Sequence, residues 1–513
     1  MQTGSNSATG LVVSSVIGAL TVAVFYTTKE AVGLPIANAA IALAVFVQGL
    51  FVLRFAWNLE LGGRLAIPFA TTFLGIQHIA FGLGGLFVTF FNEGFDYENA
   101  QGLFDWAPAT TRCLILHGLS MNVSLLGIWL ASARLRGNSG HQGGSWRTGI
   151  TWDFVGPLCM VTLAMHGPCW VLPGLITMPD PVQYVVQSFA PCTLGSYLLW
   201  GLSWTDCRSK NVFIAYNIAF VVLMMIEGSR GIFMYPILMF SIGYLISAPP
   251  GFFRLSPVLK WMPLILLVFW AFLKTDDLRT RFARGAPTDF ADAMERLDFI
   301  FGSSADDSGA DSGRGDGSGR EMNGMFRIGS RLFELSAADV TARTPEEFPF
   351  WGWTDEDTSI LLTGFVPLKL NPNATANTSG TAGVLFLQTY GWTQVDPTQG
   401  NSMPATVVAD SWRRFGWLGV VLTYVILAWV FTKLSLLGEF TVGDDFKATF
   451  FTAFTCTAFQ YTTDMTTLVS STPRRVAVTA AFALLVQFLA SFQSRRKRAS
   501  ARRVSWQAAG LVR

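Results

Sequence analysis

Residues 33–53 read GLPIANAAIALAVFVQGLFVL and contain no charged side chain. A helix that crosses the hydrocarbon core of a bilayer needs about 20 mainly apolar residues. A buried strand is much shorter than this run. The run therefore predicts a membrane-spanning helix, and we examined the rest of the chain for similar runs.

Similar apolar runs recur along most of the chain. The predicted spans are residues 11–26, 33–53, 66–90, 111–133, 154–175, 183–204, 211–227, 231–247, 260–273, 414–433, 447–469 and 475–492. Hydrophobic residues make up 51% of the sequence and charged residues only 14%, whereas a soluble domain carries roughly 25% charged residues. We therefore expect an all-α fold, a polytopic transmembrane helix bundle of about 12 spans, with much of its surface facing lipid.

The distribution of basic residues predicts the orientation of the bundle. Short cytoplasmic loops are enriched in Lys and Arg, and the C-terminal tail, residues 495–513, begins with RRKR. Counting back through the spans places both termini in the cytoplasm. The connecting segments then alternate between basic and acidic, and this alternation was not used to choose the spans.

The same count divides the chain into four parts. Residues 1–273 form an N-terminal transmembrane bundle of about nine spans, 274–410 one large loop on the opposite face, 411–494 about three further spans, and 495–513 a cytoplasmic tail. A loop of this length is usually functional or partly disordered. Residues 303–320 are Ser, Asp and Gly with little to bury, and we expect them to be disordered.

The loop is also expected to contain short helices. Residues 321–340 have the pattern of an amphipathic helix, which places Arg327, Arg331 and Glu334 on one face. Arg279 and Arg281 follow the ninth predicted span closely. Solvated ion pairs would explain most of these charges. The alternative is that these arginines lie where a lipid diphosphate would sit at the membrane surface.

Residues 227–231 read EGSRG and lie between two apolar runs. One interpretation is a tight turn in which Gly228 and Gly231 allow the bend and Arg230 pairs with Glu227. The other is that Arg230 is held at the mouth of the bundle to receive an anionic ligand, because the planar guanidinium group matches phosphate oxygens.

Asp410 precedes an Arg- and Trp-rich stretch that leads into the tenth predicted span. This stretch could be an interfacial belt, with Asp410 near the positive end of the helix dipole. Alternatively, Asp410 is a carboxylate beside a membrane cavity that takes a proton from a hydroxyl group or orients a sugar.

Several kinds of chemistry have no motif in this sequence. There is no P-loop and no GxGxxG stretch after a strand, so we expect no nucleotide cofactor. No CxxC pair suggests a metal site, and we expect neither a bound metal nor a nucleic-acid partner.

Four stretches, in this order, are similar to those of the O-antigen and exopolysaccharide repeat-unit polymerases of Gram-negative bacteria. They are Gly228 to Gly231 (GSRG), the arginine-bearing helix from Arg327 to Glu334 with Thr344-Pro345 after it, Gly364 to Pro372 (GFVPLKLNP), and Pro404 to Gly419. The resemblance covers roughly residues 205–435. Before residue 205, the similarity is limited to the presence of membrane helices.

The resemblance implies a glycosyltransferase of the bacterial inner membrane whose large loop is periplasmic. The donor would be a growing chain on undecaprenyl diphosphate, and the acceptor a sugar hydroxyl on the next lipid-linked repeat unit. A chain-length regulator would be a plausible membrane partner, and no cofactor is needed because the leaving group is already a diphosphate. On this basis the diphosphate is assigned to Arg230 with Arg279 or Arg281, phosphate or sugar to Arg327 and Arg331, and the general base to Asp410 or Glu334.

Two other functions fit a membrane bundle with a large outer loop. O-antigen ligases are expected to use a histidine of that loop, and residues 274–410 contain none. A transporter or flippase for lipid-linked sugars would perform no chemistry. Transporters usually show related, interrupted helices in two halves, a symmetry that is not evident in this sequence.

Overall fold

The structure is a computed structural model, and the statements below concern the residues that it describes. These are 3–58, 66–91, 106–136, 196–228, 290–302, 340–355 and 406–441, with shorter pieces at 152, 156, 159–160, 163–164, 179, 236–237, 239–241, 243–244, 266–267, 270–275, 278, 282, 325, 329, 358–359, 390, 477, 481 and 488. Within these residues the secondary structure consists of helices and turns, without strands.

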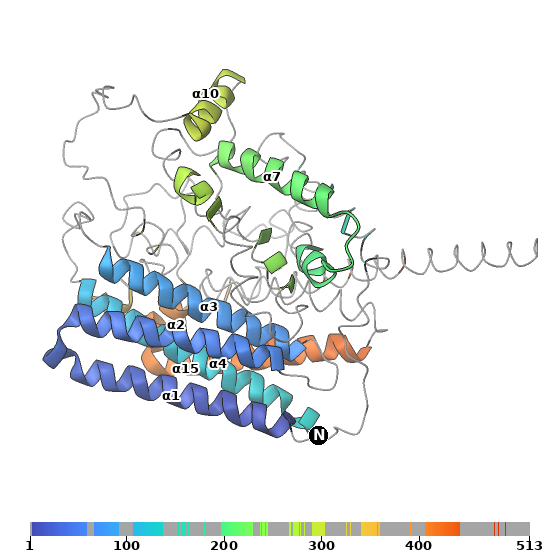
Figure 1. The fold of residues 1–513 in the computed structure, drawn as a ribbon. Helices are drawn as coiled ribbons and strands as arrows, with labels where there is room; N and C mark the ends of the chain where they lie inside the picture. The colour runs from blue at the N-terminus through green and yellow to red at the C-terminus, as the bar shows by residue number, and fades with distance from the viewer. Residues whose placement is uncertain are drawn as a thin grey trace, which may run out of the picture.

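Seven helices are described from end to end. They are α1 (Thr3–Val32), α2 (Leu34–Asn58), α3 (Ala66–Phe90), α4 (Trp106–Arg136), α7 (Lys210–Glu227), α10 (Phe290–Phe301) and α15 (Val407–Thr441). Helices α1 to α4 and α15 lie side by side as one bundle (Figure 1), in which α4 packs against α1, α2, α3 and α15. Helices α7 and α10 pack against each other.

Three stretches of the described residues are long and apolar enough to cross a membrane. They are Leu34–Val52 in α2, Thr111–Ala131 in α4 and Val407–Val430 in α15. Many large hydrophobic side chains on these helices point outward, such as Leu43 and Leu418, which are 51% and 65% exposed. The predicted all-α fold is thus confirmed for the described residues, and membrane-length helices are present among them. The total of about 12 spans and the side on which each loop lies stay predictions.

Six of the predicted spans coincide with described helices, namely 11–26, 33–53, 66–90, 111–133, 211–227 and 414–433. The predicted ends are less accurate. Helix α15 begins at Val407 rather than at residue 414, because ion pairs within its first turns allow a charged stretch to be helical and buried. The predicted disordered segment 303–320, the tail 495–513 and most of the other predicted spans lie outside the described residues.

Glycines allow close approach between the helices of the bundle. A Cβ atom added at Gly127 in α4 would lie 2.6 Å from the carbonyl oxygen of Val425 in α15. One added at Gly82 in α3 would lie 2.5 Å from the amide nitrogen of Phe46 in α2. Small residues let membrane helices pack backbone against backbone, so these positions fix the spacing of the bundle.

Gly127→Ala is expected to lower the stability of the protein, because its methyl group would meet backbone rather than a movable side chain. Overpacking of this kind costs about 1–3 kcal/mol. Gly118 on the same helix is a matched control, since a Cβ there would first meet Val45 Cγ2 at an ordinary 3.6 Å. Thermal unfolding in detergent should show a lower midpoint for Gly127→Ala and an unchanged or higher one for Gly118→Ala. Equal midpoints for the two variants would contradict this packing.

Polar side chains also join the helices. Gln48 Nε2 of α2 donates a hydrogen bond to Asn122 Oδ1 of α4, at 2.6 Å. Thr111 Oγ1 of α4 donates to Asn38 Oδ1 near the start of α2. Such hydrogen bonds hold membrane helices together, and the second one places the first turns of α2 and α4 next to each other.

Candidate functional site

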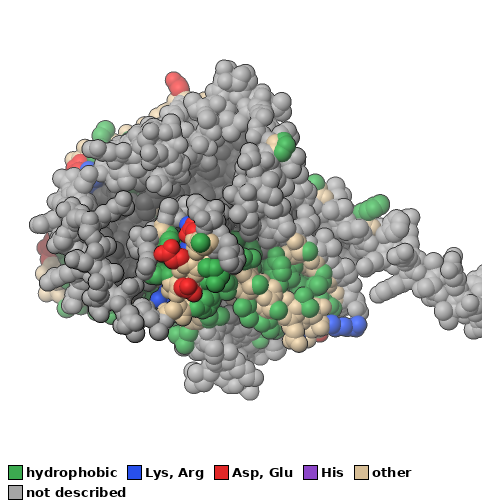
Figure 2. All heavy atoms as spheres, turned by 90° about the horizontal axis from the view of Figure 1, so that it is seen from above, with side chains coloured by type: hydrophobic (Ala, Val, Ile, Leu, Met, Phe, Trp, Pro, Cys, Tyr) green, Lys and Arg blue, Asp and Glu red, His purple; other side chains and the backbone are tan. Residues whose placement is uncertain are grey.

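Charged residues gather where α4 and α15 begin and where residues 340–355 lie against both. We call this group the arginine cluster; it consists of Arg112, Arg343, Arg413, Arg414, Glu346, Glu347 and Asp410. Acidic and basic side chains lie next to hydrophobic ones on the face shown in Figure 2.

Asp410 lies in the first turn of α15, whereas the predicted span begins after it at residue 414, and its side chain is fully buried. Its Oδ1 atom accepts a hydrogen bond from Arg413 Nε at 2.6 Å and another from Arg414 Nε at 3.0 Å. Residues three and four positions apart lie on the same side of a helix, so the spacing along the chain creates this arrangement. Asp410 thereby holds two guanidinium groups in a place where only 2% of Arg413 and 4% of Arg414 are exposed.

Two tryptophans of residues 340–355 cover these arginines. The guanidinium carbon of Arg413 lies 4.1 Å from the centre of the Trp351 ring, and that of Arg414 lies 5.6 Å from the centre of the Trp353 ring. Both distances are in the range of cation–π attraction. The backbone N–H groups of Trp351 and Gly352 donate to the carbonyl oxygens of Arg413 and Arg414, at 2.9 and 3.2 Å. Residues 351–353 are therefore attached to α15 by backbone as well as side chains.

Arg112, in the first turns of α4, also binds residues 340–355. Its Nη1 atom donates to the carbonyl oxygens of Thr341 and Ala342, at 3.0 and 3.3 Å. Its Nη2 atom donates to Glu346 Oε1 at 2.7 Å. The guanidinium group thus joins the end of one membrane-length helix to a segment more than 200 residues away in the sequence.

Residues around Thr344 complete the attachment. The Thr344-Pro345 peptide bond is cis, and the Thr344 carbonyl oxygen accepts a hydrogen bond from Trp412 Nε1 at 2.9 Å. Arg343 donates to Glu347 Oε2 at 2.8 Å and to the Tyr390 carbonyl oxygen at 2.6 Å. Since Trp412 belongs to α15, this region and the start of α15 form one unit.

Gly416 interrupts the regular geometry of α15. Its φ of 61° and ψ of −144° are open to glycine but strained for other residues. A Cβ atom there would lie 3.2 Å from the ring of Phe350. Beyond this break Trp417 is 49% exposed, and Phe350 is 45% exposed. The cluster is thus bordered by an exposed aromatic surface.

The charge balance of the cluster favours anions. Its members are four arginines and three carboxylates, which leaves one surplus positive charge among them. The N-terminus of α15 adds the positive end of a helix dipole at the same place.

The ion pair between Arg112 and Glu346 also shifts a pKa. Burial acts to raise the pKa of the Glu346 carboxyl group, but the hydrogen bond and the positive charge of Arg112 outweigh it and hold this pKa below its ordinary value. The carboxylate form of Glu346 is therefore favoured in the folded protein, although the side chain is 51% exposed.

Glu346→Gln is expected to lower the free energy of unfolding at neutral pH by less than about 1 kcal/mol, because the pair is half exposed. A depressed pKa in the folded state stabilises the protein above the ordinary pKa of a glutamate, about 4.3. This contribution is lost as the pH falls through the lower, folded value. The difference in thermal midpoint between the wild type and Glu346→Gln should thus shrink from pH 7 toward pH 3. Asp355→Asn, at an exposed carboxylate of the same segment, is the control; a difference that does not depend on pH would contradict the ion pair.

Of the site residues predicted from the sequence, only Asp410 lies within the described part of the chain. Arg230, Arg279, Arg281, Arg327, Arg331 and Glu334 lie outside the described residues. The structure thus does not test whether these six side chains meet. The base role of Asp410 also stays a prediction, and the contacts that are described make this carboxylate an anchor for two arginines.

The structure does describe the residues that lead to Arg230. Helix α7 ends at Glu227, and Gly228 follows with a left-handed φ of 75°. Its N–H group donates to the Met225 carbonyl oxygen at 2.9 Å. A left-handed glycine is a common end of a helix, and the rest of the predicted turn, from Ser229 to Gly231, lies outside the described residues.

Sequence reasoning missed an arginine at this helix end. Arg296 of α10 donates from Nη1 to the Ile226 carbonyl oxygen at 2.9 Å, and its Nε atom donates to Asp292 Oδ1 at 2.9 Å. A guanidinium group at a helix C-terminus satisfies a carbonyl group that has no partner in the helix. The four-residue spacing of Asp292 and Arg296 is visible in the sequence, whereas the contact with α7 is not.

No group of three or more His, Cys, Asp and Glu side chains suited to a metal ion occurs among the described residues. No protein-family model, curated protein or solved structure matches the chain.

Proposed function

We propose that this chain is a membrane glycosyltransferase that joins lipid-linked oligosaccharide repeat units into O-antigen or exopolysaccharide. The donor and acceptor are both carried on undecaprenyl diphosphate, and the reaction takes place on the periplasmic face of the bacterial inner membrane. The proposal starts from the four sequence stretches that resemble repeat-unit polymerases and from the membrane-length helices α2, α4 and α15.

The contact between two of these stretches supports the proposal most directly. Thr344-Pro345 follows the second stretch and Trp412 belongs to the fourth, and the two are joined by the 2.9 Å hydrogen bond from Trp412 to the Thr344 carbonyl oxygen. The contact lies in the arginine cluster, at the start of a helix of membrane length. The two stretches are therefore neighbours in the fold, as parts of one functional site would be.

The proposed topology has about 12 spans, with both termini in the cytoplasm and residues 274–410 in the periplasm. In this arrangement the first turns of α4 and α15 lie at the periplasmic end of the bundle. The arginine cluster is then at the level of lipid phosphates on that side. A large loop attached at this level can reach a lipid diphosphate whose hydrocarbon chain remains in the bilayer.

We assign two kinds of role to the charged residues. Asp410, Arg413 and Arg414 are positioning residues, because their ion pairs and their contacts with Trp351 and Trp353 hold residues 340–355 against α15. Arg230, with Arg279 or Arg281, binds the diphosphate and stabilises the charge that develops as it leaves.

The acceptor must also lose a proton. Arg327 and Arg331 bind phosphate or sugar in this assignment, and Glu334 takes the proton of the acceptor hydroxyl group. Asp410 remains the alternative base, although its described contacts are those of an anchor. No metal or nucleotide takes part, because the diphosphate is already an activated leaving group.

Loss of the gene in its native host tests this function against its alternatives. A polymerase mutant should display single repeat units in place of polymer. A ligase mutant would accumulate polymer on the lipid, and a flippase mutant would retain single units on the cytoplasmic face. Mass spectrometry of extracted lipid-linked saccharides separates these products, and either of the last two results would overturn the proposal.

A further inference from the structure

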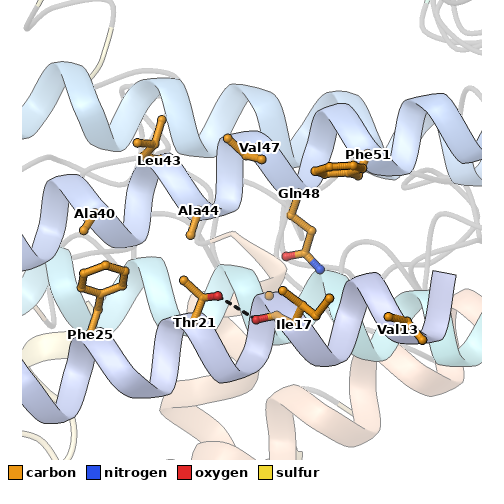
Figure 3. Close-up of a pocket in the computed structure, with 11 residues that line it drawn as sticks. Val13, Ile17, Thr21, Phe25, Ala40, Leu43, Ala44, Val47, Gln48 and Phe51 are labelled. Atoms are coloured by element: carbon orange, nitrogen blue, oxygen red, sulfur yellow. Dashed lines mark hydrogen bonds between the residues drawn. The ribbon is translucent and has the colours of Figure 1, made fainter. Parts of the chain in front are cut away.

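An apolar groove runs between α1 and α2, away from the arginine cluster (Figure 3). On α1 it is lined at four-residue spacing by Val13, Ile17, Thr21 and Phe25, positions that share one face of a helix. Its volume is about 530 Å³. The hydroxyl group of Thr21 donates to the Ile17 carbonyl oxygen at 2.8 Å, so this polar side chain is satisfied within its own helix.

The wall formed by α2 is also apolar. Its lining side chains are Ala40, Leu43, Ala44, Val47, Gln48 and Phe51. Gln48, the polar member, donates to Asn122. No charged side chain lines the groove, and Ile17 and Leu43 at its rim are 58% and 51% exposed. The occupant must therefore be a hydrocarbon that enters from the surface of the bundle.

The dimensions of the groove indicate the shape of this occupant. The lining of α1 covers twelve residue steps, or about 18 Å at 1.5 Å per residue. The volume then corresponds to a mean cross-section of about 30 Å². This cross-section is sufficient for one extended hydrocarbon chain.

The contacts of the helices connect the groove to the arginine cluster. Phe25 and Ala40 line one end of the groove, and between them the chain passes from α1 to α2 at Gly33. Asn38, two residues before Ala40, accepts the hydrogen bond from Thr111, and Thr111 directly precedes Arg112 of the cluster. This end of the groove therefore lies at the same end of the bundle as the arginine cluster, on another side of α2.

We propose that this groove binds the polyisoprenoid chain of the lipid diphosphate substrate. The inference rests on the proposed function for the identity of the lipid. It adds a second recognition site, in which α1 and α2 hold the hydrocarbon while Arg230, with Arg279 or Arg281, binds the diphosphate head. Such a site favours one lipid over the ordinary phospholipids of the bilayer, because a chain and a diphosphate must fit at the same time.

Photo-crosslinking tests the groove without any sugar transfer. The full-length protein in nanodiscs is illuminated with undecaprenyl diphosphate that carries a diazirine in mid-chain and no sugar. Adducts are expected on Ile17, Thr21, Leu43 and Val47, and excess unlabelled undecaprenyl diphosphate should remove them. An equal excess of phosphatidylglycerol should leave the adducts in place. If phosphatidylglycerol removes them equally well, the groove holds ordinary lipid and the proposal is overturned.

Filling the groove gives a second, independent test. Thr21→Leu and Ala44→Leu should each reduce the adducts about tenfold, the effect of excluding about two methylene groups. Leu20→Phe is the control, since Leu20 is 60% exposed on α1 and does not line the groove. Adduct yields that the filling variants leave unchanged would overturn the proposal. Adducts without any polymerising activity would instead refute the proposed function and leave the groove assignment intact.

Discussion

Asp410→Asn is expected to lower the free energy of unfolding by about 3–5 kcal/mol, the cost of removing one partner from a buried ion pair. The substitution keeps the shape of the side chain but leaves Arg413 and Arg414 buried without their shared carboxylate. Chemical denaturation of the protein in detergent micelles, followed by intrinsic fluorescence, measures this loss.

Two further variants make the result specific. Glu347→Gln removes the carboxylate paired with Arg343, but Glu347 is 45% exposed, so its loss should cost less than about 1 kcal/mol. Arg413→Gln combined with Asp410→Asn should recover part of the stability that Asp410→Asn loses, because one of the two buried positive charges is then absent. If Asp410→Asn costs no more than Glu347→Gln, the buried group is not the anchor of α15.

Arg230→Ala should abolish polymer formation, with a loss of activity on the order of 10² to 10³ or more, while the protein stays in the membrane. Removal of one group that stabilises developing negative charge has effects of this size. The readout is the length distribution of the polysaccharide on gels, together with the amount of protein in the membrane fraction.

Lys210→Ala is the matched control for this experiment. Lys210 begins α7 and Arg230 follows its end, so the two variants remove a positive charge at opposite ends of one helix. Polymer of normal length from Arg230→Ala would refute the assignment of the diphosphate to this residue. If Lys210→Ala also abolishes polymer formation, the effect of Arg230→Ala would be attributed to the folding of α7 and not to binding of the diphosphate.

The apolar runs were sufficient to predict the helices of the bundle. The run at residues 33–53 became α2, whose described bounds are Leu34–Asn58, because an uncharged stretch of this length can satisfy its backbone in a membrane only as a helix. The predicted start of α15 is seven residues too late. Charged residues normally mark the edge of a membrane span, but Asp410 lies three and four residues before Arg413 and Arg414. This spacing allows ion pairs within a helix.

Contacts between distant segments could not be predicted in the same way. Nothing in the local sequence of Arg112 indicates that it binds the carbonyl groups of residues 341–342, or that Arg296 binds the end of α7. These bonds depend on tertiary packing, which periodicity does not specify. Thr344-Pro345 and Trp412 belong to two separate stretches of the resemblance, and the hydrogen bond between them was not predicted either.

The proposed function requires that the protein polymerises lipid-linked repeat units without a nucleotide or a metal. Purified protein in nanodiscs should be given undecaprenyl diphosphate-linked repeat units in buffer containing EDTA, and the lipid-linked products should be separated on a gel. We predict a ladder that lengthens by whole repeat units and the release of undecaprenyl diphosphate, neither of which appears with Arg230→Ala. Repeat units that remain single with the wild-type protein, while the same preparation binds the lipid, would contradict the account.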